Sequence, residues 1–273
     1  MFPFGAAVFD EYKNLKSLTV IDIPYKYSQC LSSMKPIKTL TYLKMEFFHE
    51  NYIYSSEVCT VLLQEDSQLE TLIITGRSIR LSGAIAIGSS PKLKTLIIIL
   101  EHQQDLLLLL RHLPLIEYLD VTIAQETTRH DVYDVANDGS YSKQLKTFII
   151  QTSGNSSAIN FHLLEVLLEH FEYSLEYLAV YCTCDGLIDG QQLLSATRSN
   201  LKQLNFFLHF DRNMKPYNLL DYLSTFKEAT TPITYYYNTS CQHFFLFNTS
   251  MNKARMIAAQ INLQHLLIDT EQI

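Results

Sequence analysis

The sequence predicts an α/β solenoid, in which short parallel strands form a curved sheet on the concave side and helices and loops lie on the convex side. Three observations support this fold class. A phrase of the form L-x-x-L-x-L, clearest in residues 91–100, recurs along nearly the whole chain. Its copies begin roughly 23 to 30 residues apart, close to the leucine-rich-repeat period of about 20–29. The stretches between the copies place apolar residues at helical spacing.

Each copy of the phrase predicts one strand. The copies are residues 15–20, 40–45, 69–74, 91–100, 116–121, 145–150, 175–180, 201–206 and 263–268. The second half of a copy alternates, so Leu96 and Ile98 point toward the core while Thr95, Ile97 and Ile99 point away from it. One such strand cannot bury its apolar side alone, but stacked copies share a continuous core. The alternative is a doubly wound α/β sheet, which does not require a leucine in front of every strand.

The segments between strands predict the helices of the repeat. Apolar residues recur at intervals of three and four residues, the spacing of one helix face, in five segments: residues 57–64, 105–112, 161–171, 191–197 and 217–226. Two polar segments, residues 125–141 and 151–160, are longer than a repeat requires. They are either loops that contact a partner or tolerated surface insertions.

The C-terminal part predicts a cap. The wide gap between Leu201 and Leu263 requires a degenerate copy near Ile233. Residues 231–240 and 242–250 are aromatic, β-rich runs that predict a hairpin. A last repeat would otherwise expose its core, so residues 208–273 are expected to be a degenerate repeat and an aromatic cap. The prediction is therefore a single leucine-rich-repeat domain over residues 1–273, with about nine irregular repeats.

Composition excludes several classes of partner. The net charge is −7 and the lysines and arginines form no basic run, which argues against nucleic acid. No apolar run is long enough to span a bilayer, so no membrane contact is expected. Five cysteines without framework spacing, and no export signal, indicate a reducing compartment, the cytoplasm or the nucleus.

The sequence offers no legible catalytic site. It lacks a phosphate-binding glycine loop, an H-E-x-x-H pair and a G-x-S-x-G elbow. Cys182 and Cys184 have no second ligand pair at finger spacing, and His130, Asp131 and Asp134 fit a solvated acidic loop. We therefore expect no enzyme activity, no cofactor and no bound metal.

What remains is a surface for a protein partner. The residues that alternate with the core positions face the concave side, where tyrosines and isoleucines gather. Aromatic anchors and apolar patches are typical of protein interfaces. The predicted contact residues are Tyr118, Asp120, Tyr177, Tyr181, Asn205, Phe207, Ile97 and Ile99. A register one residue different would exchange core and surface, and loops could also fill this side.

The phrases in residues 113–121 (LPLIEYLDV) and 174–182 (SLEYLAVYC) resemble the leucine-rich repeats of F-box proteins. Residues 231–247 are similar to the C-terminal end of some large invertebrate F-box families. In that family an N-terminal F-box binds the Skp-type adaptor of a cullin–RING ubiquitin ligase and the repeats capture the substrate. The fourteen residues before Leu15 are too few for an F-box. The resemblance thus implies a substrate-binding repeat region, with the adaptor as a partner only if an F-box precedes it.

Two other functions fit the same observations. One is a free-standing repeat scaffold or sensor domain without a ligase connection. The other is an α/β hydrolase or transferase with an unrecognised site, for which a deep pocket lined by His130, Asp131 and Asp134 would be the sign.

Overall fold

The computed structural model divides into two compact units, residues 1–121 with 130–145 and residues 122–129 with 146–273. It describes residues 14–21, 38–47, 66–81, 90–124, 142–153, 158–184, 186–195, 200–210, 216, 218–226, 233–238, 243–248 and 251–260.

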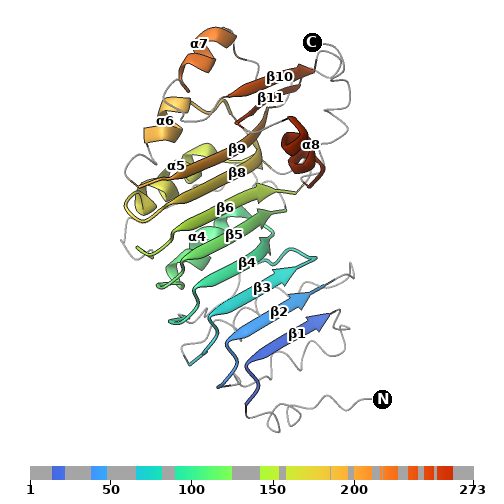
Figure 1. Ribbon diagram of the computed structural model, residues 1–273, viewed down its shortest axis with the longest axis vertical. Helices are drawn as coiled ribbons and strands as arrows, with labels where there is room; N and C mark the ends of the chain where they lie inside the picture. The colour runs from blue at the N-terminus through green and yellow to red at the C-terminus, as the bar shows by residue number, and fades with distance from the viewer. Residues whose placement is uncertain are drawn as a thin grey trace. The chain divides into compact units, whose positions relative to one another are not determined.

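The first unit is a sheet whose strands follow chain order (Figure 1). Its strands are β1 (Ser17–Ile21), β2 (Tyr42–Glu46), β3 (Thr71–Thr75), β4 (Thr95–Leu100) and β5 (Tyr118–Ile123), the last of which ends two residues beyond the unit. The pairs from β1 to β4 are parallel. Each strand begins two residues after the first apolar residue of its L-x-x-L-x-L phrase (Leu93 in residues 91–100), which confirms the strands expected at these five copies.

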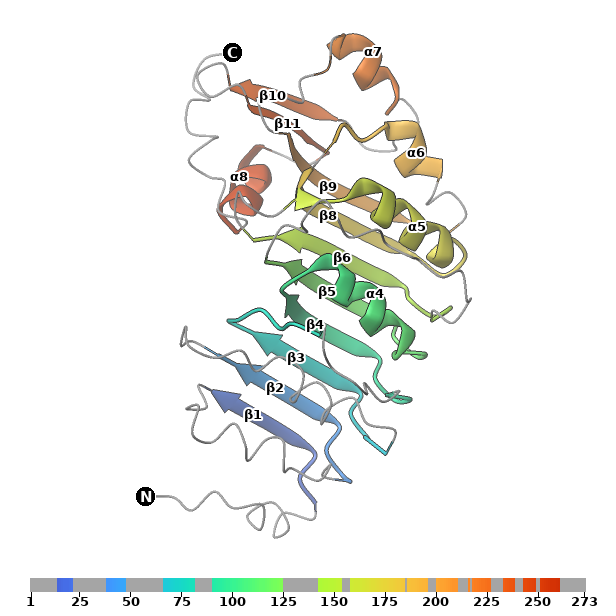
Figure 2. The same ribbon diagram turned by 180° about the vertical axis from the view of Figure 1, so that it is seen from behind.

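Alternation along the strands separates a core side from a second side. Leu96, Ile98 and Leu100 of β4 are buried, and the residues between them are half-buried. The helix α4 (Gln103–Arg111) lies on one side of the sheet (Figure 2) and buries Leu106 and Leu110 completely. This register agrees with the expected one, since the leucine and isoleucine positions of the phrase form the core.

A repeated backbone hydrogen bond fixes the register at the strand starts. The carbonyl oxygen of Glu70 accepts from the N–H groups of both Lys94 and Thr95. The carbonyl of Lys94 accepts in the same way from Glu117 and Tyr118. In the second unit the equivalent acceptors are the carbonyl oxygens of Lys146 and Glu176. The same two-residue step therefore recurs at several junctions between successive phrases within each unit.

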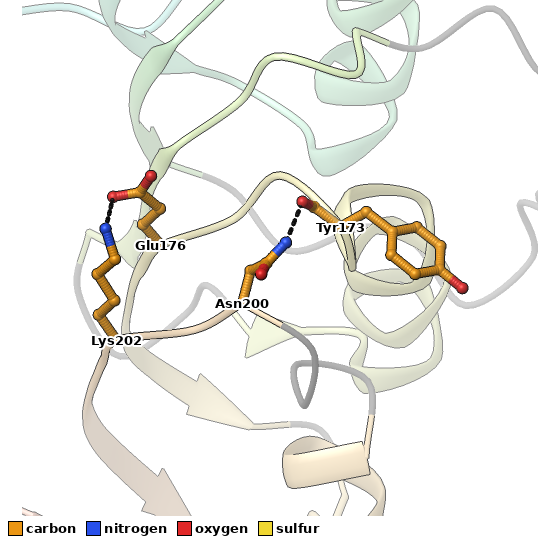
Figure 3. Close-up of polar contacts among 4 residues, drawn as sticks. All are labelled: Tyr173, Glu176, Asn200 and Lys202. Carbon is orange, nitrogen blue, oxygen red and sulfur yellow. Dashed lines mark hydrogen bonds and ion pairs between the residues drawn. The ribbon is translucent and has the colours of Figure 1, made fainter.

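Opposite charges also alternate at the second position of the phrase. Glu70 pairs with Lys94 at 3.9 Å, and Glu176 pairs with Lys202 at 2.7 Å (Figure 3). The Lys202 ammonium donates a hydrogen bond to Glu176 and lowers the pKa of that carboxyl. Such exposed pairs stabilise a fold only weakly. Their alternation disfavours a shift that would bring like charges together.

The second unit continues with parallel strands and ends in an antiparallel hairpin. Its strands are β6 (Thr147–Thr152), β7 (Ala158–Ile159), β8 (Tyr177–Cys184), β9 (Gln203–Phe210), β10 (Thr234–Asn238) and β11 (His243–Phe247). β6, β8 and β9 pair in parallel, while β11 is antiparallel to both β9 and β10. The aromatic hairpin is therefore confirmed. The degenerate repeat expected near Ile233 is wrong, because the strand there belongs to that hairpin.

Helices cover both sides of the second unit's sheet. Three helices, α5 (Phe161–Phe171), α6 (Gly190–Ser195) and α7 (Leu219–Ser224), lie on one side, and α8 (Met251–Gln260) lies on the other (Figures 1 and 2). On the first side, the Phe171 ring of α5 meets Phe148 of β6 at 6.4 Å. Phe226, just beyond α7, meets Phe206 of β9 at 5.8 Å.

Four of the five expected helices are found, at α4, α5, α6 and α7. The fifth, residues 57–64, lies outside the described residues, as do the expected strand 263–268 and the loop 125–141. The helix α8 is an element that the sequence analysis did not predict.

Asn248 joins the hairpin to the parallel strands. It is 8% exposed; its Oδ1 accepts from the Phe206 N–H at 2.7 Å and its Nδ2 donates to the Leu204 carbonyl at 2.6 Å. Asn248→Ala leaves two buried backbone groups without these partners. We expect it to lower the free energy of unfolding by about 2 to 3 kcal/mol, measured by urea denaturation. Asn252→Ala, at an exposed position of α8, should change it far less, and equal losses would contradict this role.

Candidate partner-binding face

The predicted binding face consists of the side chains at the third and fifth positions of each L-x-x-L-x-L phrase and of the residue that directly follows the phrase. In the first unit all of these from β2 to β5 are half-buried. They are Tyr42, Lys44, Glu46, Thr71, Ile73, Thr75, Thr95, Ile97, Ile99, Tyr118 and Asp120. Among the described elements, no helix lies over this side of β1 to β5 (Figure 1). Within the described residues these side chains are therefore partly accessible.

The centre of this face is apolar. Strand register places Ile73 beside Lys44 on one side and beside Ile97 on the other. The Lys94 carbonyl, which accepts from Glu117 and Tyr118, sets Asp120 next to Ile97 in the same row. The row therefore reads Lys44, Ile73, Ile97 and Asp120, with about 4.8 Å between strands. Ile99 extends the apolar centre by one step along β4.

The two charged residues at the ends of this row, Lys44 and Asp120, differ in whether a described side chain pairs with their charge. Lys44 forms an ion pair with Glu46 at 3.4 Å, and about two-thirds of both side chains is shielded. The Asp120 carboxylate makes no hydrogen bond or ion pair among the described residues. Burial raises the pKa of its carboxyl above the ordinary value. The charge of Asp120 is thus partly desolvated, and no described side chain compensates it.

In the second unit the equivalent positions are internal only in part, since those of β6 are half-buried and the buried ones lie on β8 and β9. Phe207 is fully buried in a cluster with Tyr236, Phe245, Phe247 and three residues of α8, Ala254, Ile257 and Ala258. Tyr181 is half-buried and packs against this cluster. The prediction that Phe207 is a surface anchor is therefore corrected, because α8 covers that part of the sheet.

Asn205 and Tyr177 are engaged with each other. The Asn205 Nδ2 donates to the Tyr177 hydroxyl at 2.9 Å, and Asn205 is only 9% exposed. The prediction that the Asn205 amide is available to a partner is also corrected. Of the eight predicted contact residues, Ile97, Ile99, Tyr118 and Asp120 lie together on the uncovered part of the face, with Tyr177 and Tyr181 half-buried in the second unit.

Two sequence signals could have revealed this covering. Residues 204–210 read LNFFLHF, a nearly continuous apolar run, whereas a strand with one solvent-facing side alternates. An apolar helix face, with residues spaced by three and four, is formed by Ala254, Ile257 and Ala258. The first signal requires a covering element on each side of β9, and the second identifies α8 as one of them.

A histidine pair continues the same face beyond Phe207. His209 Nε2 lies 2.7 Å from His243 Nδ1, and His209 Nδ1 lies 3.1 Å from the Thr183 hydroxyl. The His209 ring stacks on Phe245 at 4.9 Å and is 2% exposed. Such a buried, hydrogen-bonded ring contributes to packing between β8, β9 and β11.

The part of the chain that the structure describes contains no group of three histidine, cysteine or acidic side chains placed to hold a metal. Cys182 and Cys184 are buried thiols whose sulfurs lie 3.7 Å apart. His130, Asp131 and Asp134 lie outside the described residues. No described helix has both the length and the apolar character needed to cross a membrane.

A scan of the chain against protein-family models found no match, and searches of curated proteins and of solved structures found none either.

Proposed function

We propose that this chain is a protein-recognition module of the leucine-rich-repeat type, and that it binds its partner on the uncovered face of the first unit. The observation that carries the proposal is the half-buried apolar centre formed by Ile73, Ile97 and Ile99 on strands in fixed register. Exposed apolar patches bounded by polar residues are typical of interfaces. In the second unit the equivalent position of Phe207 is instead buried against α8.

The strand arrangement supports the repeat interpretation. The parallel strands follow chain order within each unit, as expected when each repeat contacts its neighbours. A doubly wound enzyme sheet reverses strand order at a switch point, where its ligand binds. No such reversal occurs between β1 and β5. Two compact units are also compatible with one repeat array, because contacts in such an array are local.

A more specific form of the proposal comes from the resemblance to F-box proteins. In this form the face captures the substrate of a cullin–RING ubiquitin ligase, and a Skp-type adaptor binds an F-box outside this chain. The repeat phrases in residues 113–121 and 174–182 support it. Co-purification of a Skp-type adaptor with the full-length protein would support the ligase connection, and its consistent absence would leave a repeat module of another kind.

Ile97→Lys tests the proposed face. A lysine stem can lie along the sheet with its ammonium in water, so folding should be retained while the apolar centre is disrupted. We expect partner capture to fall at least about tenfold, equivalent to about 1.4 kcal/mol. The measurement is quantitative affinity purification with mass spectrometry, with thermal unfolding recorded in parallel.

Leu187→Lys is the control, because Leu187 is an aliphatic residue, 43% exposed, that precedes α6 and belongs to no strand. Proteins that bind the proposed face should be lost with Ile97→Lys and retained with Leu187→Lys. Identical capture by wild type and both variants would contradict the proposal.

A further inference from the structure

We propose that Asp120 and Tyr118 form a subsite for an arginine side chain of the protein partner, next to the apolar centre at Ile97. This inference rests on the proposed function and specifies the chemistry of the partner. In this proposal Asp120 selects a positive charge on the partner. The apolar side chains that flank the partner's arginine pack on Ile73, Ile97 and Ile99.

The distribution of charge on the face leads to Asp120. Across β2 to β5, the charged members of this face within the described residues are Lys44, Glu46 and Asp120. Lys44 and Glu46 neutralise each other at 3.4 Å. Asp120 is left as the one charge on these strands without a described counter-ion. Electrostatic complementarity therefore requires a positive group from the partner at this end of the row.

The burial of Asp120 supports the same conclusion. Desolvation raises the pKa of this carboxyl, so the folded chain holds its charged form at a cost. An incoming cation would offset that cost, and a neutral group would not. A residue whose charge destabilises the unbound protein but stabilises the complex is typical of a binding site.

The neighbours of Asp120 favour arginine over lysine. Tyr118 is two residues earlier on β5, so its side chain emerges on the same face. A planar guanidinium can form two hydrogen bonds with a carboxylate and also stack on an aromatic ring, whereas an ammonium is a compact point charge. Ile97 in the adjacent strand supplies the apolar wall that excludes water from such a pair. The net charge of −7 also attracts a basic partner at long range.

The first experiment pans a phage-displayed random peptide library on the full chain and on three variants. We expect wild type to enrich peptides in which an arginine stands beside apolar residues. Asp120→Asn should reduce the arginine enrichment at least tenfold while apolar enrichment persists. Asp66→Asn, which removes an exposed carboxylate before β3, should match wild type, and Ile97→Lys should lose enrichment altogether.

A double-substitution cycle then isolates the contact. The selected peptide is synthesised with arginine and with its neutral analogue citrulline. The exchange should weaken binding about tenfold to wild type and less than twofold to Asp120→Asn. The subsite is overturned if the exchange weakens binding equally for both proteins, or if arginine enrichment survives Asp120→Asn. The proposed function would still stand in that case, provided that the selected peptides are lost with Ile97→Lys. If no peptide depends on Ile97, both fall.

Thermal unfolding separates this role from a structural one. With its pKa raised, the Asp120 carboxyl is better tolerated protonated in the folded chain, so its contribution to stability is present at low pH and lost as pH rises through the folded value. Asp120→Asn should therefore melt at or above the wild-type temperature at pH 7, and the difference should vanish near pH 3. A lower melting temperature at pH 7 would show that Asp120 is a structural residue and would overturn the proposal.

Discussion

Phe207→Ala is expected to lower the free energy of unfolding by about 3 to 5 kcal/mol. The Phe207 side chain is fully buried, and its ring stacks on Phe247 at 6.0 Å and meets Phe245 at 5.8 Å. Removing the ring leaves a cavity between β9, β11 and α8, where the surrounding rings cannot fully collapse. The loss should be accompanied by loosening of α8, whose buried residues Ala254, Ile257 and Ala258 pack in this cluster.

Urea denaturation followed by circular dichroism measures this effect, with hydrogen exchange of α8 as a second readout. Ile97→Ala is the matched control, because Ile97 belongs to the same face but is only half-buried. It should cost clearly less than Phe207→Ala. If the two substitutions cost the same, the distinction between a covered and an uncovered part of the face would be wrong.

Gly76→Ala is expected to destabilise the first unit by more than about 3 kcal/mol. Gly76 follows β3 with a φ of +92°, in the region that glycine adopts readily and other residues avoid. A Cβ here would also overlap the backbone carbonyl oxygen of Phe47, and the N–H of Phe47 donates to the Thr75 carbonyl at 3.0 Å. Because backbone cannot move as a side-chain tip can, the ends of β2 and β3 would separate.

Differential scanning calorimetry of Gly76→Ala beside Gly186→Ala tests this prediction. A Cβ at Gly186 meets nothing within 4 Å, so the control should unfold close to the wild-type temperature. A Gly76→Ala protein that melts with the control would show that the turn after β3 is not constrained as described.

The sequence was informative about local and neighbouring structure. The phrase L-x-x-L-x-L predicted eight strands in the described residues, because a strand's core positions follow from its own alternation. The helix 161–171 was predicted with the bounds that α5 has, since three- and four-residue spacing of leucines is a local property. The aromatic hairpin was also predicted, because its two β-rich runs are separated by only a few residues.

The sequence was less informative about which strands are covered by a helix that lies far away in the sequence. Ile99 and Phe207 occupy equivalent positions of their phrases, yet Ile99 is half-buried and Phe207 is in the core. The difference arises from α8, which follows Phe207 by more than forty residues and returns over β9. A repeat pattern describes contacts between adjacent copies, so it contains no information about an element that packs back on the sheet.

The measurement that tests the central claim most directly is hydroxyl-radical footprinting of the native protein. The account predicts that Tyr42, Ile97, Ile99 and Tyr118 are modified readily, at rates scaled to their half-exposed side chains. Phe207, Phe245 and Phe247 should be protected until the protein unfolds, since all three are fully buried. Protection of the first group, or modification of the second at similar rates, would contradict a binding face that is uncovered in the first unit and closed by α8 in the second.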